Sequence, residues 1–500
     1  MINTSGWMER TPMQKQSFLV VLALGFSSPA FADGCTDLAK LQLPLVHIDS
    51  AQPVAKGVPL VLWNGGQPSP VPQTFCRVKG TARPVPGSTI GFEVWLPEAG
   101  QWNGKFMQAG NGGFAGSVPI PSLFDALGQG YASAGTDGGH QSSDGLDASW
   151  ALNHRERIVD FGWRAVQQTT VAAKGLIQAY YQSKPKLSYF VGCSNGGRDA
   201  MMAAQRFPED FDGIVAGAPA IAWTDLMTGQ AIIQNILAPP VALLPVSKLP
   251  HLQSAALEQC AAGNAYVKDP LACQFKPEKM KCKAADSATC LTAPQIAAVR
   301  DVYTGIVNPG TGQKIYGMEP GAEAQPGNWD FWILNSPTNP LGASDKQISM
   351  AAGFFRYFVR NDPDFTLQAV TRSDFKQAHK LWHADLNAVD PDLSRFKARG
   401  GKLLHYHGWN DSAVPPRLSL AYQESVRKKM GDIHDFYKLY MVPGMNHCWG
   451  GTGPWQVNWL TVLEVWVEKG VAPEAVTATD LAGSGSQLLQ ANGLPKKTKN

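Results

Sequence analysis

Two short motifs far apart in the sequence each place a cysteine beside a residue that could take part in nucleophilic catalysis. Cys193 and Ser194 are adjacent in Gly-Cys-Ser-Asn-Gly, and His447 and Cys448 are adjacent in Pro-Gly-Met-Asn-His-Cys. A serine hydroxyl is a poor nucleophile near neutral pH and needs a base such as histidine. If Ser194 is the nucleophile and His447 its base, folding also brings their neighbouring cysteines within disulfide range.

The residues around Ser194 predict the strand, sharp turn and helix that a catalytic serine requires. Leu187–Val191 has the apolar run of a buried strand, and Asp199–Arg206 has the pattern of a helix that stops near Pro208. In a nucleophile elbow the serine has a strained backbone, and flanking glycines relieve crowding so that the hydroxyl projects above a parallel sheet. This context favours an α/β fold of the α/β-hydrolase type.

The candidate acid and base follow the serine in the chain order expected for that fold, with the acid before the base. Lys402–His407 has the pattern of a strand and leads into the loop that carries Asp411. Phe436–Val442 is a second strand-like run and ends in the glycine-containing turn that carries His447. Both residues are therefore expected at the carboxyl ends of neighbouring strands.

Other acids and histidines compete with this assignment. Asp432 and Asp435 are alternative acids, but they precede the last strand instead of following one. His405 and His407 alternate along a strand, and without a third ligand at recognisable spacing they are interpreted as packed or surface histidines instead of metal ligands. His140 lies in a glycine-rich loop and is interpreted as structural.

Attack by a serine on a carbonyl carbon also needs hydrogen-bond donors for the oxyanion of the tetrahedral intermediate. One is expected to be the backbone N–H of Asn195, the residue after the nucleophile. The second should come from an early loop, and the glycine-rich segment 110–116 follows a strand-like run at Lys105–Ala109. A simple flexible turn is the alternative for this segment, and it matches neither the P-loop nor the dinucleotide pattern.

Composition places the chain among ordinary globular proteins of one large or two medium domains. It has 500 residues, of which 44% are hydrophobic and 17% charged, and a net charge of +3. Lysines and arginines form no run apart from the lysine-rich last residues. We therefore expect neither nucleic acid nor a membrane surface as a partner.

The N-terminus has the layout of a secretory signal. Arg10 and Lys15 precede an apolar run at residues 18–26, and Ala30-Phe31-Ala32 offers small residues for cleavage after Ala32. The apolar run is too short to span a membrane. We therefore expect a secreted or periplasmic protein, the alternative being a disordered start with a chance apolar patch.

Export would favour disulfides over thiol chemistry for all eight cysteines. Cys35 with Cys76 would staple the N-terminal region, and Cys193 with Cys448 would pair beside the candidate site. The other four lie close together in the sequence and suggest two short-range bridges whose pairing stays open: Cys260, Cys273, Cys282 and Cys290.

Four motifs together resemble the tannase and feruloyl esterase family, which includes the bacterial hydrolase of mono(2-hydroxyethyl) terephthalate. They are Gly-Cys-Ser-Asn-Gly-Gly-Arg at 192–198, Phe-Asp-Gly-Ile-Val-Ala-Gly-Ala-Pro-Ala at 211–220, Gly-Trp-Asn-Asp at 408–411 and Pro-Gly-Met-Asn-His-Cys-Trp-Gly-Gly at 443–451. The resemblance covers most of the chain after the signal. It implies Ser194 as nucleophile, His447 as base and Asp411 as orienting acid.

The resemblance also implies a hydrolase core interrupted by a large lid. We expect a signal peptide at 1–32, a catalytic domain at 33–220 and 384–482, a lid at 221–383 and a disordered tail at 483–500. By position in the early loop, Gly113 is the expected second oxyanion donor, with Gly112 as the next choice.

The expected lid is rich in aromatic residues that could form an apolar pocket for a flat acyl group. The pocket candidates are Trp223, Phe354 and Phe355, with Arg356 as a partner for a substrate carboxylate or hydroxyl. The aromatic set also includes Trp329, Phe331, Trp332, Tyr357, Phe358 and Trp382, and Arg360 is a second candidate cation. The alternative is that most of these aromatics build the core of the lid itself.

The family's calcium loop is degenerate in this chain. Segment 260–270 is shorter than usual and has lost most of its carboxylates, whereas calcium needs six to eight oxygen ligands. We therefore expect no metal and no cofactor.

These observations predict a secreted serine esterase that cleaves esters of aromatic acids, with feruloyl esters as the first choice. Galloyl esters and a terephthalate monoester are alternatives within the same chemistry. A carbohydrate-binding or scaffold protein with a relic elbow is the alternative from another class. The expected partner is a small aromatic ester or an ester derived from a plant polymer.

Overall fold

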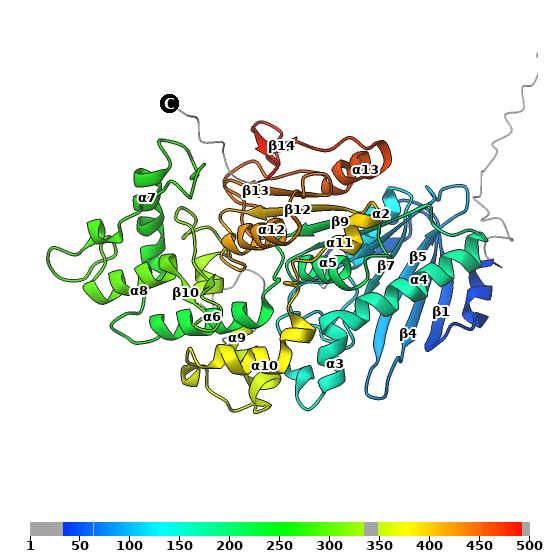
Figure 1. Ribbon diagram of the computed structural model, residues 1–500, viewed down its shortest axis with the longest axis horizontal. Coiled ribbons are helices and arrows are strands. Elements are labelled where there is room, and N and C mark those ends of the chain that lie inside the picture. The colour runs from blue at the N-terminus through cyan, green and yellow to red at the C-terminus, as the bar shows by residue number, and fades with distance from the viewer. Residues whose placement is uncertain (1–33, 64, 335–348, 493–500) are drawn as a thin grey trace, which may run out of the picture.

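The computed structural model describes residues 34–63, 65–334 and 349–492. The expected signal peptide at 1–32 therefore lies outside the described residues. A nine-stranded sheet forms the centre of the molecule, in the order β1-β4-β5-β7-β6-β8-β9-β12-β13 (Figure 1). Its strands are β1 (Val46–Val54), β4 (Phe75–Ala82), β5 (Ile90–Pro97), β6 (Lys105–Ala109), β7 (Ala132–Thr136), β8 (Leu187–Cys193), β9 (Gly213–Gly217), β12 (Lys402–Gly408) and β13 (Tyr437–Val442).

Helices cover both faces of this sheet, because successive side chains of a strand point to opposite sides. Phe190 of β8 joins an apolar core with α4, α5 and α12, while Tyr189 joins a second core with α2 and α13. The covering helices are α2 (Ile120–Gly128), α4 (Ala165–Tyr181), α5 (Asn195–Arg206), α12 (Arg417–Met430) and α13 (Trp459–Lys469). This doubly covered, largely parallel sheet confirms the predicted α/β fold.

The chain reverses its direction of travel across the sheet at the centre. From β6 it passes through α2 to the neighbour β7 on one side, and then through α3 (Arg155–Val159) and α4 to β8 on the other side of β6. Strands β6 and β8 run parallel. The crevice at the carboxyl ends of two such strands is where open α/β sheets bind their ligands.

The first three strands extend the sheet by antiparallel pairing. β1 pairs with β4, β4 with β5, and β5 with β7. The bridge between Cys35 and Cys76 ties the start of the described chain to β4. Two short strands, β2 (Pro59–Leu60) and β3 (Ser69–Pro70), form a separate pair.

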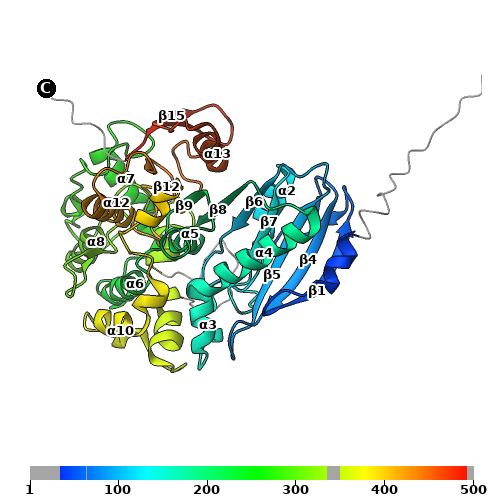
Figure 2. The same ribbon diagram turned by 45° about the vertical axis from the view of Figure 1, so that its right-hand side comes forward.

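A mainly helical unit connects the adjacent strands β9 and β12 and has its own apolar core. In both views it lies on the side of the molecule where β9 and β12 are, away from β1 and β4 (Figures 1 and 2). It contains α6 (Trp223–Leu237), α7 (Leu249–Cys260), α8 (Ala293–Thr304), α9 (Met350–Gly353), α10 (Asp374–Leu386), β10 (Ile306–Val307) and β11 (Lys314–Ile315). The next helix, α11 (Ser394–Ala398), belongs to the sheet instead, since its Phe396 joins the core that contains Phe190. The expected lid at 221–383 falls between β9 and β12.

The C-terminal segment corrects one expectation. β15 (Ser486–Gln490) lies in the stretch 483–500 that was expected to be disordered, and it pairs antiparallel with β14 (Ala475–Thr479). The physical reason is that buried Leu489 joins the core under α13, and that Gln487 donates to the carbonyl of Pro443. Residues 493–500 lie outside the described residues.

Candidate active site

Ser194 occupies a sharp turn between β8 and α5. Its backbone has φ 65° and ψ −123°, which is the left-handed region that a non-glycine residue rarely adopts. The N–H of Ser194 donates to Gly217 O at 2.9 Å, and the N–H of Ala220 donates to Ser194 O at 3.1 Å. The end of β9 therefore holds the strained turn in place, as the predicted elbow requires.

Close backbone approach explains the glycines around this turn. A Cβ on Gly192 would lie 2.3 Å from Gly196 O, and one on Gly196 would lie 2.8 Å from Asn111 O. Only glycine fits at either position without a shift of the main chain. These contacts bring the loop after β6 directly against the elbow.

The loop after β6 presents free backbone donors beside the elbow. The N–H of Phe114 donates to Gly145 O at 2.7 Å, and the N–H of Ala115 donates to Gly112 O at 2.8 Å. The amides of Gly112 and Gly113 have no acceptor in the part of the chain that the structure describes. Asn195 is the first residue of α5, so its N–H points out of the helix start.

Asp411 and His447 meet at the ends of β12 and β13. His447 Nδ1 donates to Asp411 Oδ2 at 2.7 Å, and the N–H groups of Ala413 and Val414 both donate to Oδ1 at 2.8 Å. Asp411 is the only one of the competing acids in contact with His447 among the described residues, since Asp432 and Asp435 bond elsewhere. This hydrogen bond fixes the proton of His447 on Nδ1 and leaves Nε2 as the available base.

The electrostatics of Asp411 favour its ionised form. Burial acts to raise its pKa. The hydrogen bonds and electrostatic attraction of His447 and His407 have a larger effect in the opposite direction, so the pKa of Asp411 lies below the usual range of an aspartate. The side chain of Asp411 is completely buried, whereas that of His447 is 17% exposed. An ionised acid behind a partly open base is the arrangement that general-base catalysis needs.

A disulfide joins the elbow to the histidine loop. Cys193 and Cys448 are bonded with Cα atoms 5.9 Å apart, across 255 residues of sequence. The bridge places Ser194 and His447 next to each other, although their side chains form no hydrogen bond among the described residues. The structure therefore brings the three candidate residues to one place and bonds two of them directly.

Together with that bridge and the one between Cys35 and Cys76, two further bridges pair all eight cysteines, as expected. Cys260 pairs with Cys273 and Cys282 pairs with Cys290, which resolves the pairing that the sequence left open. Both bridges lie in the helical unit.

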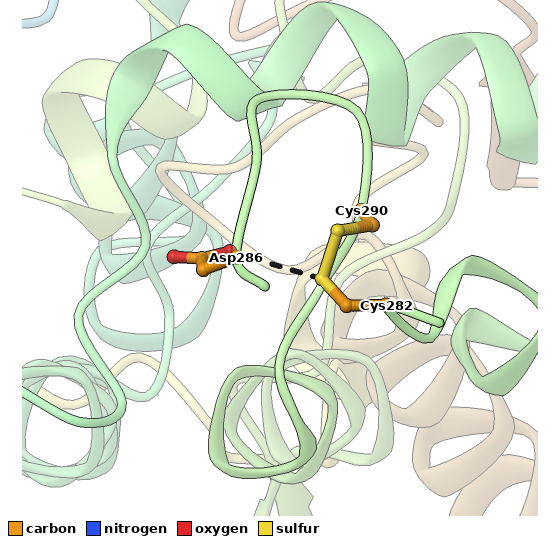
Figure 3. Close-up of side chains that lie close together, drawn as sticks. All are labelled: Cys282, Asp286 and Cys290. Carbon is orange, nitrogen blue, oxygen red and sulfur yellow. Dashed lines mark hydrogen bonds between the residues drawn. A yellow bond between two sulfur atoms is a disulfide. The ribbon is translucent and has the colours of Figure 1, made fainter. Parts of the chain in front are cut away.

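One group of metal-type side chains occurs within the described ranges, and it does not suit an ion. Cys282, Asp286 and Cys290 lie together (Figure 3), but the two sulfurs form a disulfide and Asp286 is paired with Lys248. In segment 260–270 the single carboxylate, Asp269, receives the N–H of Ala272. These donors do not fit a calcium cage, and the expectation of no metal stays a prediction.

Three of the expected pocket residues belong to the core instead. Trp223 is 1% exposed, and Phe354 and Phe355 are 0% exposed. All three belong to the apolar core of the helical unit, where Trp223 packs against Phe114 and Phe161 and Phe354 packs against Phe355. Side chains without free surface cannot line a pocket in this conformation, so this placement corrects the expectation and favours the alternative that the aromatics build the core.

Arg356 lies in a different cavity. Its Nε donates to Phe365 O at 3.0 Å, and it lines a cavity of about 320 Å³ together with residues such as Gln234 and Gln368. No residue of the candidate triad lines that cavity. A role for Arg356 in binding substrate stays a prediction.

Trp332 of the helical unit lies beside His447. Its ring centroid is 5.9 Å from that of His447, in an edge-on arrangement, and its side chain is half-buried. Buried Asn328, one helical turn earlier, donates to the carbonyl of Asn410 at 2.9 Å. The helical unit is thus attached to the loop that carries Asp411. The sequence included Trp332 in the aromatic set, but nothing in its spacing separated it from the core residues.

The three histidines that competed with His447 in the sequence, His140, His405 and His407, are buried. His140 stacks on Trp150 with centroids 3.7 Å apart, and burial lowers its pKa to about 4, with a smaller contribution from Arg157. It is therefore neutral near pH 7, in keeping with the structural interpretation. His405 and His407 are completely buried, and His407 contacts Asp411, which the sequence analysis did not anticipate.

The fold and the site together define an α/β-hydrolase, with a serine elbow and an Asp–His pair at the carboxyl ends of the parallel strands. The family model described as "Tannase and feruloyl esterase" matches residues 76–497. The chain therefore belongs to the tannase and feruloyl esterase family, and it is a carboxylesterase with a small-molecule ester as substrate.

Relatives and solved structures agree with this family. An uncharacterized esterase of Xanthomonas campestris pv. campestris is 40% identical over 494 residues, covering 90% of this chain and 84% of that protein. "Probable feruloyl esterase B-2" of Aspergillus terreus is 30% identical, covering 94% of this chain and 93% of the relative. The crystal structure of feruloyl esterase B from Aspergillus oryzae superposes with a TM-score of 0.83 at 27% identity, covering 92% of this chain and 96% of that one.

The bridge between Cys193 and Cys448 predicts a specific defect. Replacing both cysteines by alanine should lower the free energy of unfolding by up to about 5 kcal/mol, the chain-entropy limit for so long a loop. It should also lower the kcat of the molecules that remain folded by about tenfold or more, because Ser194 and His447 lose their shared anchor. Ester hydrolysis corrected for the folded fraction measures this.

The double variant of Cys35 and Cys76 is the matched control, since that bridge joins β4 to the start of the described chain. It should lower stability and leave kcat unchanged. Equal kcat values for both double variants would show that the bridge between Cys193 and Cys448 stabilises the fold but does not position Ser194 and His447.

Asp137 should make stability depend on pH. It follows β7 and accepts the N–H groups of Gly91 and Gly139 at 3.0 and 2.8 Å. Burial, with a smaller contribution from the Asp160 carboxylate, raises the pKa of Asp137 to about 7, against the effect of these two N–H groups.

An unfolded aspartate titrates near about 4, so between pH 4 and 7 the folded chain keeps a proton that the unfolded chain loses. Stability from this group therefore falls as the pH rises through that window. Asp137→Asn should remove this loss, so that the variant gains stability relative to the parent between pH 4.5 and 8. Urea unfolding at pH 4.5 and pH 8 measures the free energy of unfolding of both proteins. The same difference between variant and parent at the two pH values would contradict a raised pKa for Asp137.

Proposed function

We propose that this carboxylesterase is an exported serine esterase for feruloyl esters, with Ser194 as nucleophile, His447 as base and Asp411 as the acid that orients it. The observation that carries the proposal is the hydrogen bond between His447 and Asp411 beside the bridge that links the histidine loop to the elbow. This pair matches the acid and base of a serine hydrolase triad, and the bridge supports Ser194 as the nucleophile beside them.

In the first half of the reaction, Ser194 Oγ forms a bond to the ester carbonyl carbon while its proton passes to His447 Nε2. The negative charge on the carbonyl oxygen is stabilised by the N–H groups of Asn195 and Gly113, or of Gly112 beside it. When the intermediate collapses, the bond to the alcohol oxygen breaks and His447 gives its proton to that oxygen. The alcohol leaves and the acyl group stays on Ser194.

In the second half, water attacks the acyl-enzyme by the reverse route. His447 Nε2 takes a proton from the water as its oxygen bonds to the carbonyl carbon, and then returns the proton to Ser194 Oγ as the acyl bond breaks. The products are one carboxylic acid and the regenerated serine. Asp411 stays ionised throughout and stabilises the imidazolium form of His447.

Two findings support the feruloyl group as the acyl part. Relatives named as feruloyl esterases are 30% identical over almost the whole chain, and feruloyl esterase B has the same overall structure. Trp332 places an aromatic ring next to His447, near the position that a flat acyl group would occupy during attack.

Four disulfides and the N-terminal signal pattern support export. Of the helices in the described ranges, none is long and apolar enough to cross a membrane.

Ser194→Ala should abolish hydrolysis, because the covalent route is lost. We expect kcat for methyl ferulate to fall by about 10⁴-fold or more, with the fold unchanged by circular dichroism. Buried Ser133 on β7 offers a matched control, and Ser133→Ala should keep full activity. Activity retained by Ser194→Ala would overturn the mechanism.

Trp332 should influence which acyl group is accepted. With methyl ferulate, methyl gallate and mono(2-hydroxyethyl) terephthalate as substrates, we expect the highest kcat/KM for methyl ferulate. Trp332→Ala should raise KM for it by about tenfold, the loss of one aromatic contact, while Trp332→Phe should nearly restore it. A higher kcat/KM for one of the other two esters would reassign the acyl group, and an unchanged KM would remove Trp332 from the binding site.

A further inference from the structure

A second histidine contacts the oxygen of Asp411 that already binds His447. His407 Nε2 lies 3.1 Å from Asp411 Oδ2 and 2.9 Å from the carbonyl oxygen of Val414. Both His407 and Asp411 are completely buried. The strand explains the placement, because His407 is the penultimate residue of β12 and Asp411 lies on the turn that follows.

His407 is the end of a longer buried chain of hydrogen bonds. Its Nδ1 is 2.6 Å from Ser419 Oγ of α12, and the same oxygen is 2.7 Å from His405 Nε2. His405 Nδ1 is 2.8 Å from the hydroxyl of Tyr437 on β13. His405 and His407 share one face of β12 because alternate residues of a strand point the same way.

The acceptors at one end fix the direction of the whole chain. An ionised carboxylate and a carbonyl can only accept, so His407 Nε2 must carry a proton. With His407 neutral, its Nδ1 accepts the proton of Ser419, Ser419 accepts from His405 Nε2, and His405 Nδ1 accepts the proton of Tyr437. Each ring nitrogen and hydroxyl proton of the chain then has a partner, with the Nε2–H of His407 shared between Asp411 and Val414, as a buried polar network requires.

Few other charges act on this part of the molecule. The titratable groups that face Asp411 are His447, His407 and Tyr316, whose hydroxyl donates to the carbonyl of Ser412 at 3.4 Å. Burial lowers the pKa of His405, and the nearby His407 lowers it further, so His405 is neutral. Beyond it, Tyr437 faces Tyr422, and burial raises the pKa of both phenols.

We propose that His407, oriented by Ser419 and His405, is a positioning residue for the acid of the triad. Its Nε2–H holds Asp411 Oδ2 toward His447 and takes up part of the negative charge that would otherwise act on His447 alone. The inference rests on the proposed roles of Asp411 and His447.

His407 and His447 donate to the same oxygen of Asp411, so the loss of His407 should change the pH profile of the reaction rate. Without the donor of His407, the full charge of Asp411 acts on His447 and stabilises the imidazolium form. His447 then stays protonated to higher pH, where it cannot act as a base. The acid limb of the rate profile should therefore move to higher pH, which a loss of packing alone would not cause.

Three variants separate the donor from the shape of the side chain. His407→Leu removes the donor, His407→Gln keeps an N–H at the position of Nε2, and Ser419→Ala keeps His407 but releases its tautomer. Ser133→Ala is the control for loss of a buried serine hydroxyl. The assay uses 4-nitrophenyl acetate from pH 5 to 9, so that the result does not depend on which acyl group is natural.

For His407→Leu we expect kcat to fall by about tenfold to a hundredfold, the loss of a hydrogen bond to a charged group, with KM nearly unchanged. Its acid limb should move to higher pH. His407→Gln should stay within about threefold of the parent with an unmoved limb, and Ser419→Ala should lie between the two. Equal losses in the Leu and Gln variants, or a limb that moves in neither His407→Leu nor Ser419→Ala, would overturn the proposal.

Failure of the proposed function would look different. In that case Ser194→Ala would keep activity, whatever the His407 variants do. If His407→Leu does not fold, Ser419→Ala decides the question, because it removes one atom and leaves both histidines in place.

Discussion

The buried carboxylate of Asp411 is the constraint on which the rest of the site depends. Removing an ionised group from water costs several kcal/mol unless its oxygens are fully bonded. Here Oδ1 receives the N–H groups of Ala413 and Val414, and Oδ2 receives His447 and His407. These donors come from the turn after β12, the loop after β13 and β12 itself, so both strand ends must be in register before the charge is tolerated.

The fold supplies the other half of the site at a place set by its topology. The chain leaves β6 toward one side and β8 toward the other, which is the point where open α/β sheets bind their ligands, and here the glycine-rich loop packs directly against the elbow. The bridge between Cys193 and Cys448 then ties this half to the histidine loop. Asn328 attaches the helical unit to the same loops, so that Trp332 borders the histidine. The elbow, the glycine-rich loop, the pair of Asp411 and His447, and Trp332 thus lie together at one edge of the sheet.

Local patterns in the sequence predicted much of this arrangement. The strand before Ser194, the helix after it and the strands before Asp411 and His447 are all confirmed, because each has an apolar run bounded by turn residues. The pairing of Cys193 with Cys448 followed from the assumed contact between serine and histidine.

The sequence could not separate side chains of one type that lie in different surroundings. Trp223, Phe354 and Phe355 were expected in the pocket but lie in the core, and His407 was interpreted as packing although it contacts the acid. Leu489 likewise orders a tail that looked polar, through a contact with a distant helix.

The most direct measurement is the chemical labelling of the nucleophile in the folded enzyme. A fluorophosphonate forms a stable bond with a serine only where a base and oxyanion donors activate it. The account predicts one adduct per molecule, mapped by peptide mass to the segment that contains Ser194, with activity lost in proportion to labelling. Loss of activity with the adduct on another residue, or full activity after labelling of Ser194, would contradict it.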